Sequence, residues 1–339
     1  MGELAQFLIT GGTGFIGRHV VVRLLDRGAA VGVFCRAPEK AQRLFGKRVK
    51  VFPGDLRDRA SVAEAVRGCP VVIHVGATFQ FGPAARRLAE ETNVRGTEYL
   101  LDAAEHSRVE RFVYVSSGGV LEGGPGRLTE RDFPSQVPRY EPYRRSKWLG
   151  ELAALSAAQR GMPVTIASPT CPLGEGDEGP TPTGRIVDDY LRGHFPFSAC
   201  VGLNFVHVGE VADGILAVAE RGRIGERYLL GHHNVWLQEF LQALGRVTHR
   251  RAPHLRLPQA VITFAGALGE AMGSHRVCRK TAAHARRRQW FDFSKANQEL
   301  GWIPRRSLQS IADVAVRWFQ SAEHTHMEMV LSESNVATP

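Results

Sequence analysis

The sequence from residue 10 to residue 17 reads Thr10-Gly11-Gly12-Thr13-Gly14-Phe15-Ile16-Gly17, after a short apolar run and before a helical pattern that stops at Gly28. A dinucleotide-binding turn requires this position between a strand and a helix. The first glycine permits a tight turn, the second lets backbone N–H groups approach a pyrophosphate, and the third allows close helix–sheet packing. A purely structural glycine turn is the alternative. The predicted cofactor contacts of this turn are Gly11, Thr13, Gly14, Phe15, Ile16 and Gly17.

Strand and helix patterns alternate through the first third of the chain. Apolar runs predict strands at residues 7–9, 30–34, 49–52, 71–75 and 111–115, with helical patterns between them. Runs such as Val71-Val72-Ile73 do not alternate in polarity, as expected when helices cover both faces of a sheet. This order predicts a parallel sheet with right-handed crossovers. The expected class is α/β: a Rossmann-type doubly wound sheet with a smaller C-terminal substrate subdomain.

The texture of the sequence changes near residue 165, where prolines and glycines become frequent. We therefore expect a dinucleotide-binding domain over residues 1–165. Short helices and strands follow, including strands at Phe205–Val208 and Tyr228–Leu230. Residues 166–322 are expected to be mainly a substrate-binding subdomain, interleaved with the last sheet strands. The polar tail at 323–339 is expected to be frayed.

The composition is that of a globular protein, with 43% apolar and 23% charged residues among 339. The net charge is +9, but the basic residues are scattered without a recognition-helix or RNA-binding signature, so nucleic-acid binding is not expected. Five widely spaced cysteines without a Cys-x-x-Cys pair indicate neither a zinc site nor a disulfide framework. This cysteine pattern fits a reducing cytoplasm best. Neither a signal-peptide pattern nor an apolar stretch of about 18 residues occurs.

The end of the second predicted strand bears on the choice of cofactor. An acidic residue there favours the ribose 2′-hydroxyl of NAD. This chain instead has Arg36, which can bind a 2′-phosphate, with Lys40 assisting. NADP(H) is therefore favoured over NAD(H). The alternative is that Arg36 stacks on the adenine and that both cofactors are accepted.

Further cofactor contacts are predicted where the third and fourth strands end. Asp55 is placed to accept from the adenine amino group, and Leu56 to cover the ring; the alternative for Asp55 is a helix cap. Ala77 is a small residue that permits close approach of the cofactor. His74 is interpreted as a packed strand residue, not a catalytic one.

Tyr143 and Lys147 stand four residues apart, and Pro142 suits the first turn of a helix. On a helix the two side chains share one face. A neighbouring cation stabilises phenolate and lowers the pKa of a tyrosine toward neutrality, which suits acid–base catalysis. The alternative is an exposed tyrosine beside a solvated lysine.

Ser116 and Ser117 follow the fifth predicted strand and therefore lie at the same edge of the sheet. A hydroxyl there can bond the oxygen of a carbonyl or alcohol substrate. We favour Ser117, which lies further into the loop. A glycine turn, a strand-end serine and a Tyr-x-x-x-Lys pair in this order predict an enzyme.

The chain resembles the extended short-chain dehydrogenases/reductases of the epimerase/dehydratase class over about residues 4 to 320. The region from Pro180 to Arg185 is similar to a hopanoid-associated sugar-epimerase-like branch, which also looks like dihydroflavonol reductases. The resemblance implies a catalytic triad of Ser117, Tyr143 and Lys147, and a supporting role for Asn93, whose alternative is helix packing. It also suggests a homodimer. The motifs that carry the resemblance are Thr10 to Gly17, Gly54-Asp55-Leu56, Asn93 to Thr97, Ser116-Ser117, Tyr143 to Lys147, Phe205 to Val208 and Leu300 to Pro304.

Two positions depart from the sugar-nucleotide epimerases of this class. Those enzymes usually carry an Arg-Asp pair before the Phe-x-His-Val run, where this chain has Leu203-Asn204. They also usually favour NAD, whereas Arg36 favours NADP(H). The expected reaction is reversible hydride transfer with a small-molecule carbonyl or secondary alcohol. Alternatives are an epimerase or dehydratase, and a 3-hydroxysteroid-type dehydrogenase acting on a lipid.

Two further hypotheses concern partners. Gln259 to Arg288 combines an apolar stretch with a basic flank, as an interfacial helix would, although a helix lining a substrate pocket is favoured. The non-enzyme alternative is an NADP-binding sensor or scaffold. The presence of both Tyr143 and Lys147 disfavours it.

Overall fold

The computed structural model describes residues 5–79, 85–124, 126–137, 142–194, 201–252 and 288–335, with side chains to residue 321. Of the segment Gln259 to Arg288, only Arg288 lies within the described residues. The chain forms two compact units. Unit 1 comprises Met1–Thr170, Val208–Gly231 and Phe291–Pro304, and unit 2 comprises Cys171–His207, His232–Trp290 and Arg305–Pro339.

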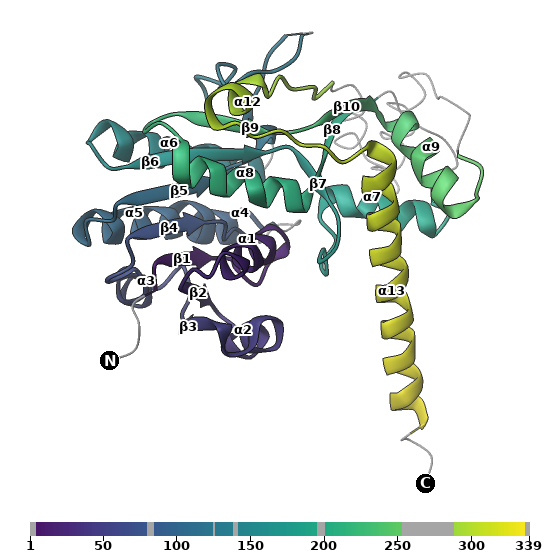
Figure 1. Cartoon of the computed structure of the whole chain (residues 1–339), viewed down its shortest axis with the longest axis horizontal. Helices are drawn as coiled ribbons and strands as arrows, with labels where there is room; N and C mark the ends of the chain where they lie inside the picture. Colours follow the sequence, from purple (N-terminus) through teal and green to yellow (C-terminus); the bar gives the residue numbers. More distant parts are fainter. Residues whose placement is uncertain are drawn as a thin grey trace. The chain divides into compact units, whose positions relative to one another are not determined.

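Unit 1 is built on a parallel sheet of seven strands within the described part of the chain, in the order β3-β2-β1-β4-β5-β6-β9 (Figure 1). The order runs outward in both directions from β1 and β4, which makes this a doubly wound sheet. The strands are β1 (Phe7–Thr10), β2 (Val31–Cys35), β3 (Val49–Pro53), β4 (Val71–His74), β5 (Arg111–Val115), β6 (Val164–Pro169) and β9 (Arg227–Leu230).

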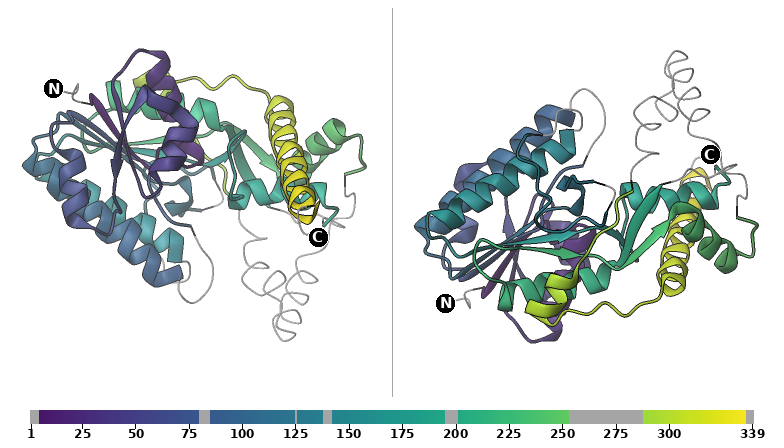
Figure 2. Two further views of the ribbon diagram at one scale, coloured as in Figure 1. Left: turned by 90° about the horizontal axis from the view of Figure 1, so that it is seen from below. Right: turned by 90° about the horizontal axis from the view of Figure 1, so that it is seen from above.

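Helices cover both faces of this sheet (Figure 2). Helices α1 and α8 pack together on one face, and α3, α5 and α6 lie on the other. A π-helical segment, η2 (Glu90–Arg95), separates α4 from α5. The helices of unit 1 are α1 (Phe15–Asp26), α2 (Pro38–Phe45), α3 (Arg59–Val66), α4 (Ala85–Ala89), α5 (Gly96–His106), α6 (Pro142–Gln159), α8 (Val208–Arg221) and α12 (Ser294–Leu300); the 3-10 turns are η1 (Gly46–Arg48) and η3 (Gly118–Val120).

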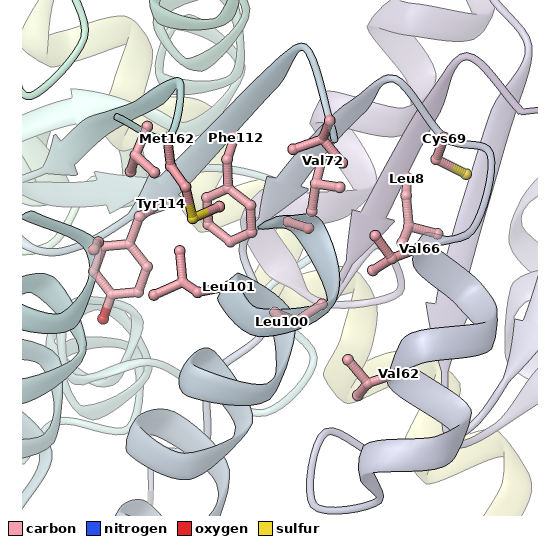
Figure 3. Packing of buried hydrophobic residues seen from close by; sticks show 14 of the residues in the cluster. Leu8, Val62, Val66, Cys69, Val72, Leu100, Leu101, Phe112, Tyr114 and Met162 are labelled. Carbon is pink, nitrogen blue, oxygen red and sulfur yellow. The ribbon is translucent and has the colours of Figure 1, made fainter. Parts of the chain in front are cut away.

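A hydrophobic core lies between the sheet and the α3–α5–α6 layer (Figure 3). Leu8, Val72 and Phe112 project from three strands and meet Val62 and Leu100 from the helices. These side chains are completely buried. Transfer of each one from water to the core stabilises the folded state by about 1.5–3 kcal/mol. The non-alternating strand runs thus supply side chains to both faces of the sheet.

Unit 2 contains a small sheet in the order β10-β8-β7, in which β8 is antiparallel to β10 and parallel to β7. Its core includes Phe205 and Phe240, whose stacked rings have centroids 4.1 Å apart. The elements are β7 (Cys171–Leu173), α7 (Pro182–Leu191), β8 (Gly202–His207), β10 (His233–Trp236), α9 (Leu237–Thr248) and α13 (Leu308–Asn335).

The sequence predictions for the first five strands are confirmed, each within one or two residues. The fold class is confirmed as well. Two local details differ from the expectations. Val208 begins α8 and does not extend β8, and α13 continues through the polar residues after Phe319 to Asn335.

Candidate active site

The predicted site residues of unit 1 lie at or beyond the carboxyl ends of neighbouring parallel strands, or on the helices that follow them. Strands β1 and β4 are adjacent, and the chain winds away from them in opposite directions. In open α/β sheets, ligands bind outside the carboxyl ends of the strands at such a switch point. The topology therefore gathers residues far apart in sequence at one edge.

The glycine turn after β1 has no room for side chains. Gly11 has a φ of +67°, and a Cβ there would lie 2.6 Å from the Cα of Gly76. A Cβ on Gly17 would lie 2.1 Å from the carbonyl oxygen of Gly11. Gly14 is the exposed N-cap of α1, and no side chain caps the helix there. The free N–H groups and the helix dipole suit a phosphate.

The remaining predicted residues of the turn lie directly around the start of α1. Thr13 precedes the helix, and Phe15 and Ile16 are its first two residues. All three are partly exposed. They can therefore contact a ligand bound at the helix N-terminus.

Arg36 follows β2 and is exposed, and Lys40 lies in the first turn of α2. The carboxylate of Asp55 accepts from the backbone N–H of Arg57 at 2.9 Å and from its guanidinium at 3.0 and 2.7 Å. The hydrogen bond from Arg57 lowers the pKa of Asp55, and the charge of Arg36 acts in the same direction. Arg36 thus lies close enough to Asp55 to influence its charge.

The alternative role of Asp55 as a helix cap was wrong. Asp58 is the N-cap of α3, and its carboxylate accepts from the backbone N–H of Ala60 at 3.0 Å. Leu56 is buried against the glycine backbone at Gly76 and Gly96. Ala77 is exposed in the loop after β4.

A chain of buried hydrogen bonds runs through His74, opposite Thr10 in the β1–β4 pairing. Thr10 Oγ1 accepts from the backbone N–H of Gly76 at 3.2 Å and lies 2.6 Å from His74 Nδ1. His74 Nε2 lies 3.0 Å from Thr97 Oγ1, which donates to the carbonyl of Asn93 at 2.7 Å. This order assigns the ring proton to Nε2.

His74 is therefore neutral and structural, as the sequence suggested. Burial lowers its pKa to about 3, and the charge of Lys147 contributes. The ring connects the phosphate side of the site to α5.

Asn93 occupies the π-helical segment and is 1% exposed. Its side-chain amide donates to the carbonyl of Thr78 at 2.9 Å, and its oxygen accepts from the N–H of Thr78 at 2.7 Å. The amide also donates to Ser146 Oγ at 2.9 Å, and Ser146 donates to the carbonyl of Tyr143 at 2.7 Å. Asn93 thus fixes the loop after β4 and the first turn of α6 together.

The two serines after β5 differ in environment. Ser116 is buried, and its hydroxyl donates to the carboxylate of Glu151. Ser117 is partly exposed, and its Oγ accepts from the backbone N–H of Gly119 at 3.1 Å. The hydroxyl hydrogen of Ser117 stays available for another acceptor. Of the two, Ser117 is the one positioned to bond a ligand.

Tyr143 and Lys147 lie one turn apart on α6, as predicted. Tyr143 is partly exposed, and its ring packs edge-on against Phe79 with centroids 4.6 Å apart. Lys147 is 2% exposed, and its Nζ donates to the carbonyl of Val115 at 2.5 Å. Burial lowers the pKa of Lys147 to about 7, opposed by the charge of Glu151.

Several residues of the site were not found from the sequence. Thr10, Thr97 and Ser146 complete hydrogen-bond chains, but short hydroxyl residues carry no sequence signal of such a role. Glu151 stands four residues after Lys147, on the same face of the helix. The spacing of four residues between Lys147 and Glu151 could therefore have indicated from the sequence that the two side chains lie close together.

Residues 7–231 match the NAD dependent epimerase/dehydratase family. The chain belongs to this family, which places it among the extended short-chain dehydrogenases/reductases. Enzymes of this family use nicotinamide cofactors for oxidoreduction, epimerisation or dehydration. The expectations of an enzyme and of this family are confirmed.

Three relatives illustrate the range of the family. The chain is 35% identical over 93% of its length to a Synechocystis protein named "Putative dihydroflavonol 4-reductase", covering 94% of that protein. It is 30% identical over 92% of its length to sterol demethylase protein B of Methylococcus capsulatus, covering 98% of it. A nucleoside-diphosphate-sugar epimerase from Pseudomonas aeruginosa superposes with a TM-score of 0.80 at 26% identity, covering 94% and 98% of the two chains.

Among the described residues, no helix is both long and apolar enough to cross a membrane. Over the same residues, no group of three or more His, Cys, Asp or Glu side chains is arranged to hold a metal ion.

Substitution of Gly17 by alanine tests the glycine turn. The added Cβ collides with the backbone of Gly11, so we expect Gly17→Ala to lose about 1–3 kcal/mol of stability and to weaken NADPH binding. Gly28→Ala is the control for adding a methyl group, because a Cβ at Gly28 meets nothing within 4 Å, although its φ of +74° strains any side chain there. It should lower stability slightly and leave NADPH affinity unchanged. Calorimetric titration and urea unfolding measure both; equal NADPH affinity in the two variants contradicts the assignment.

The buried neutral His74 predicts a pH-dependent stability. The pKa of His74 is about 3 in the folded state and about 6.5 in the unfolded state. The folded state is therefore not penalised above pH 6.5, but it loses stability as the pH falls toward 3, because only the unfolded state binds a proton there. Between these two pH values, one such group lowers the free energy of unfolding by up to about 1.4 kcal/mol for each pH unit. His74→Gln cannot titrate, so its free energy of unfolding in urea should fall less between pH 7 and pH 5 than that of the wild type. Equal pH slopes would show that His74 is not buried as a neutral ring.

Proposed function

We propose that the protein is an NADP(H)-dependent oxidoreductase that reversibly reduces a carbonyl compound to a secondary alcohol. The observation that carries this proposal is the buried Lys147, whose ammonium binds the last carbonyl of β5 one helical turn from Tyr143. Ser117 lies two residues beyond that carbonyl. The three groups of an acid–base and oxygen-binding site thus belong to one helix and the strand end that it contacts.

Each residue has a distinct role in this proposal. Tyr143 donates a proton to the oxygen as the carbonyl becomes an alcohol and removes it in the reverse direction. Ser117 uses its free hydroxyl hydrogen to bond the same oxygen. Lys147 favours the phenolate form of Tyr143 through its positive charge. Nicotinamide, when bound, supplies or accepts the hydride.

Two cations support the preference for NADP(H). Arg36 is exposed at the end of β2, where a ribose 2′-phosphate would be bound, and Lys40 follows one helical turn later. The carboxylate of Asp55 is occupied by Arg57, which reduces its repulsion toward an incoming phosphate. We assign Arg36 and Lys40 to that phosphate.

The second candidate is an epimerase or dehydratase that returns the hydride within one turnover. The structural similarity to a nucleoside-diphosphate-sugar epimerase favours it. Against it, unit 2 has Asn204 at the position of the usual acidic residue, and its buried amide is committed to Asn234 Oδ1 and the backbone of His232. Similarity to a sterol demethylase protein favours a lipid substrate instead. Stoichiometric NADPH oxidation with an aldehyde or ketone separates net reduction from epimerisation.

Substitution of Tyr143 by phenylalanine tests the proton donor. Because only the hydroxyl is removed, Tyr143→Phe should lower kcat about 100-fold or more with any carbonyl that the wild type reduces. NADPH affinity, measured by fluorescence titration, should stay nearly unchanged. Retained turnover would show that another group supplies the proton.

Substitution of Arg36 by alanine tests the cofactor preference. Loss of a charge-assisted contact to the 2′-phosphate should raise the Kd for NADPH roughly tenfold or more, with little effect on NADH. Arg43→Ala, which changes an exposed arginine further along α2, is the control. An unchanged ratio of NADPH to NADH affinity in Arg36→Ala would refute the assignment.

A further inference from the structure

Glu151 forms the centre of a buried polar cluster on α6. Its side chain is 0% exposed, and it stands one helical turn after Lys147. One carboxylate oxygen accepts from the hydroxyl of Ser116 on the end of β5, and the other accepts from Nε of Arg227 on β9. A buried carboxylate is costly unless it is paired and hydrogen-bonded, and here both oxygens are bonded.

Arg227 is itself held in place. Its guanidinium donates to the carbonyl of Glu130 at 2.7 Å and lies 4.3 Å from the ring centroid of Phe133. The carboxylate of Glu130 accepts from the backbone N–H of Leu229 at 2.9 Å. The counter-charge of Glu151 therefore has a fixed position on β9.

Glu151 and Lys147 contact consecutive residues at the end of β5. Lys147 binds the carbonyl of Val115, and Glu151 binds the hydroxyl of Ser116. The next residue is Ser117. Two attachments, one turn apart on α6, therefore hold the strand end in register with the helix that carries Tyr143.

We propose that Glu151 is a positioning residue of the active site: it holds the end of β5 against α6 and places a buried negative charge one helical turn from Lys147, so that Ser117 and Tyr143 face one substrate oxygen. The proposal rests on the proposed function for the identity of the reacting groups. It assigns a role to a carboxylate that contacts neither cofactor nor substrate.

Among the described residues, the charged and titratable groups around Lys147 belong to α6, β5 and β4, and Arg227 of β9 is bonded to one of them, Glu151. On α6 they are Glu151 and Tyr143; on β5 the ring of Tyr114 lies 4.4 Å from Nζ; and on β4 His74 is neutral. Burial lowers the pKa of Lys147, and Glu151 is the group that opposes this effect. As the pH rises through that pKa, the ammonium loses its charge and the phenolate of Tyr143 loses its support. Removing the carboxylate should shift this loss to lower pH.

The experiment follows the titration of Lys147 by NMR in the full-length protein, with lysine labelled by carbon-13 at Cε. The chain has only six lysines, and Lys147→Arg identifies the signal. In the wild type we expect a midpoint near 7. In Glu151→Gln the midpoint should fall by about one pH unit or more. Ser116→Ala, the matched control, removes one hydrogen bond but keeps the carboxylate, so its midpoint should stay at the wild-type value.

The double variant Glu151→Gln/Arg227→Met removes both buried charges and so keeps the test available if the single variant does not fold. A Lys147 midpoint that is unchanged between wild type and Glu151→Gln, or between Arg227→Met and the double variant, overturns the proposal, because each of these pairs differs only at Glu151. With an aldehyde or ketone that the wild type reduces at the expense of NADPH, the basic limb of the pH profile of kcat should shift with the midpoint. Because the NMR titration needs no substrate, a wild type that reduces no carbonyl compound overturns the proposed function and leaves the role of Glu151 to be decided by the titration.

Discussion

The bond between the buried ammonium of Lys147 and the carbonyl of Val115 determines how the active site is assembled. A charge that is 2% exposed is stable only with close partners, and the 2.5 Å contact requires α6 to approach β5 tightly. Gly150 permits this approach, because a Cβ there would lie 2.5 Å from the hydroxyl of Tyr114. The hydrogen bond of the buried Lys147 ammonium and the lack of a side chain at Gly150 thus fix the distance between α6 and β5. Tyr143 and Ser117 take their positions from that distance.

A second constraint joins the phosphate side of the site to the same helix. The pairing of Thr10 with His74 in adjacent parallel strands starts a hydrogen-bond chain that continues through Thr97 to the backbone of Asn93. The side chain of Asn93 then reaches Ser146 on α6. Every member of this chain is 0–1% exposed, so no water competes for its bonds. The glycine turn and α6 are therefore connected through hydrogen bonds as well as through the sheet.

The sequence predicts the fold and most of the candidate site because both depend on local patterns. The apolar runs that begin at Phe7 and Arg111 predict buried strands because they do not alternate in polarity. In a parallel sheet, the residues that follow the strands, such as Arg36 and Ser117, then lie at the same edge. The buried network could not be predicted in the same way. Glu151 meets Arg227 across 76 residues of sequence, and His74 meets Thr10 across 64.

Contacts between residues so far apart in the sequence produce no periodic pattern from which they could be predicted. The other differences arise where neighbouring residues suit the same role. Both Asp55 and Asp58 are suitable caps, and only the backbone conformation decides that Asp58 caps α3. Val208 has a high strand propensity, but the register of β8 ends one residue earlier.

The π-helical turn between α4 and α5 makes this part of the chain sensitive to its length. A π turn holds about one residue more than an α turn, so it offsets the faces of the helices on either side. Within the π-helical segment, Asn93 faces Thr78 and Ser146; directly after it, Gly96 rests on Leu56 and Thr97 meets His74. Loss of one residue would rotate α5 by about 100° relative to α4 and separate these two sets of contacts. Natural variants of this enzyme should therefore tolerate substitutions along α4 more readily than a change of even one residue in its length.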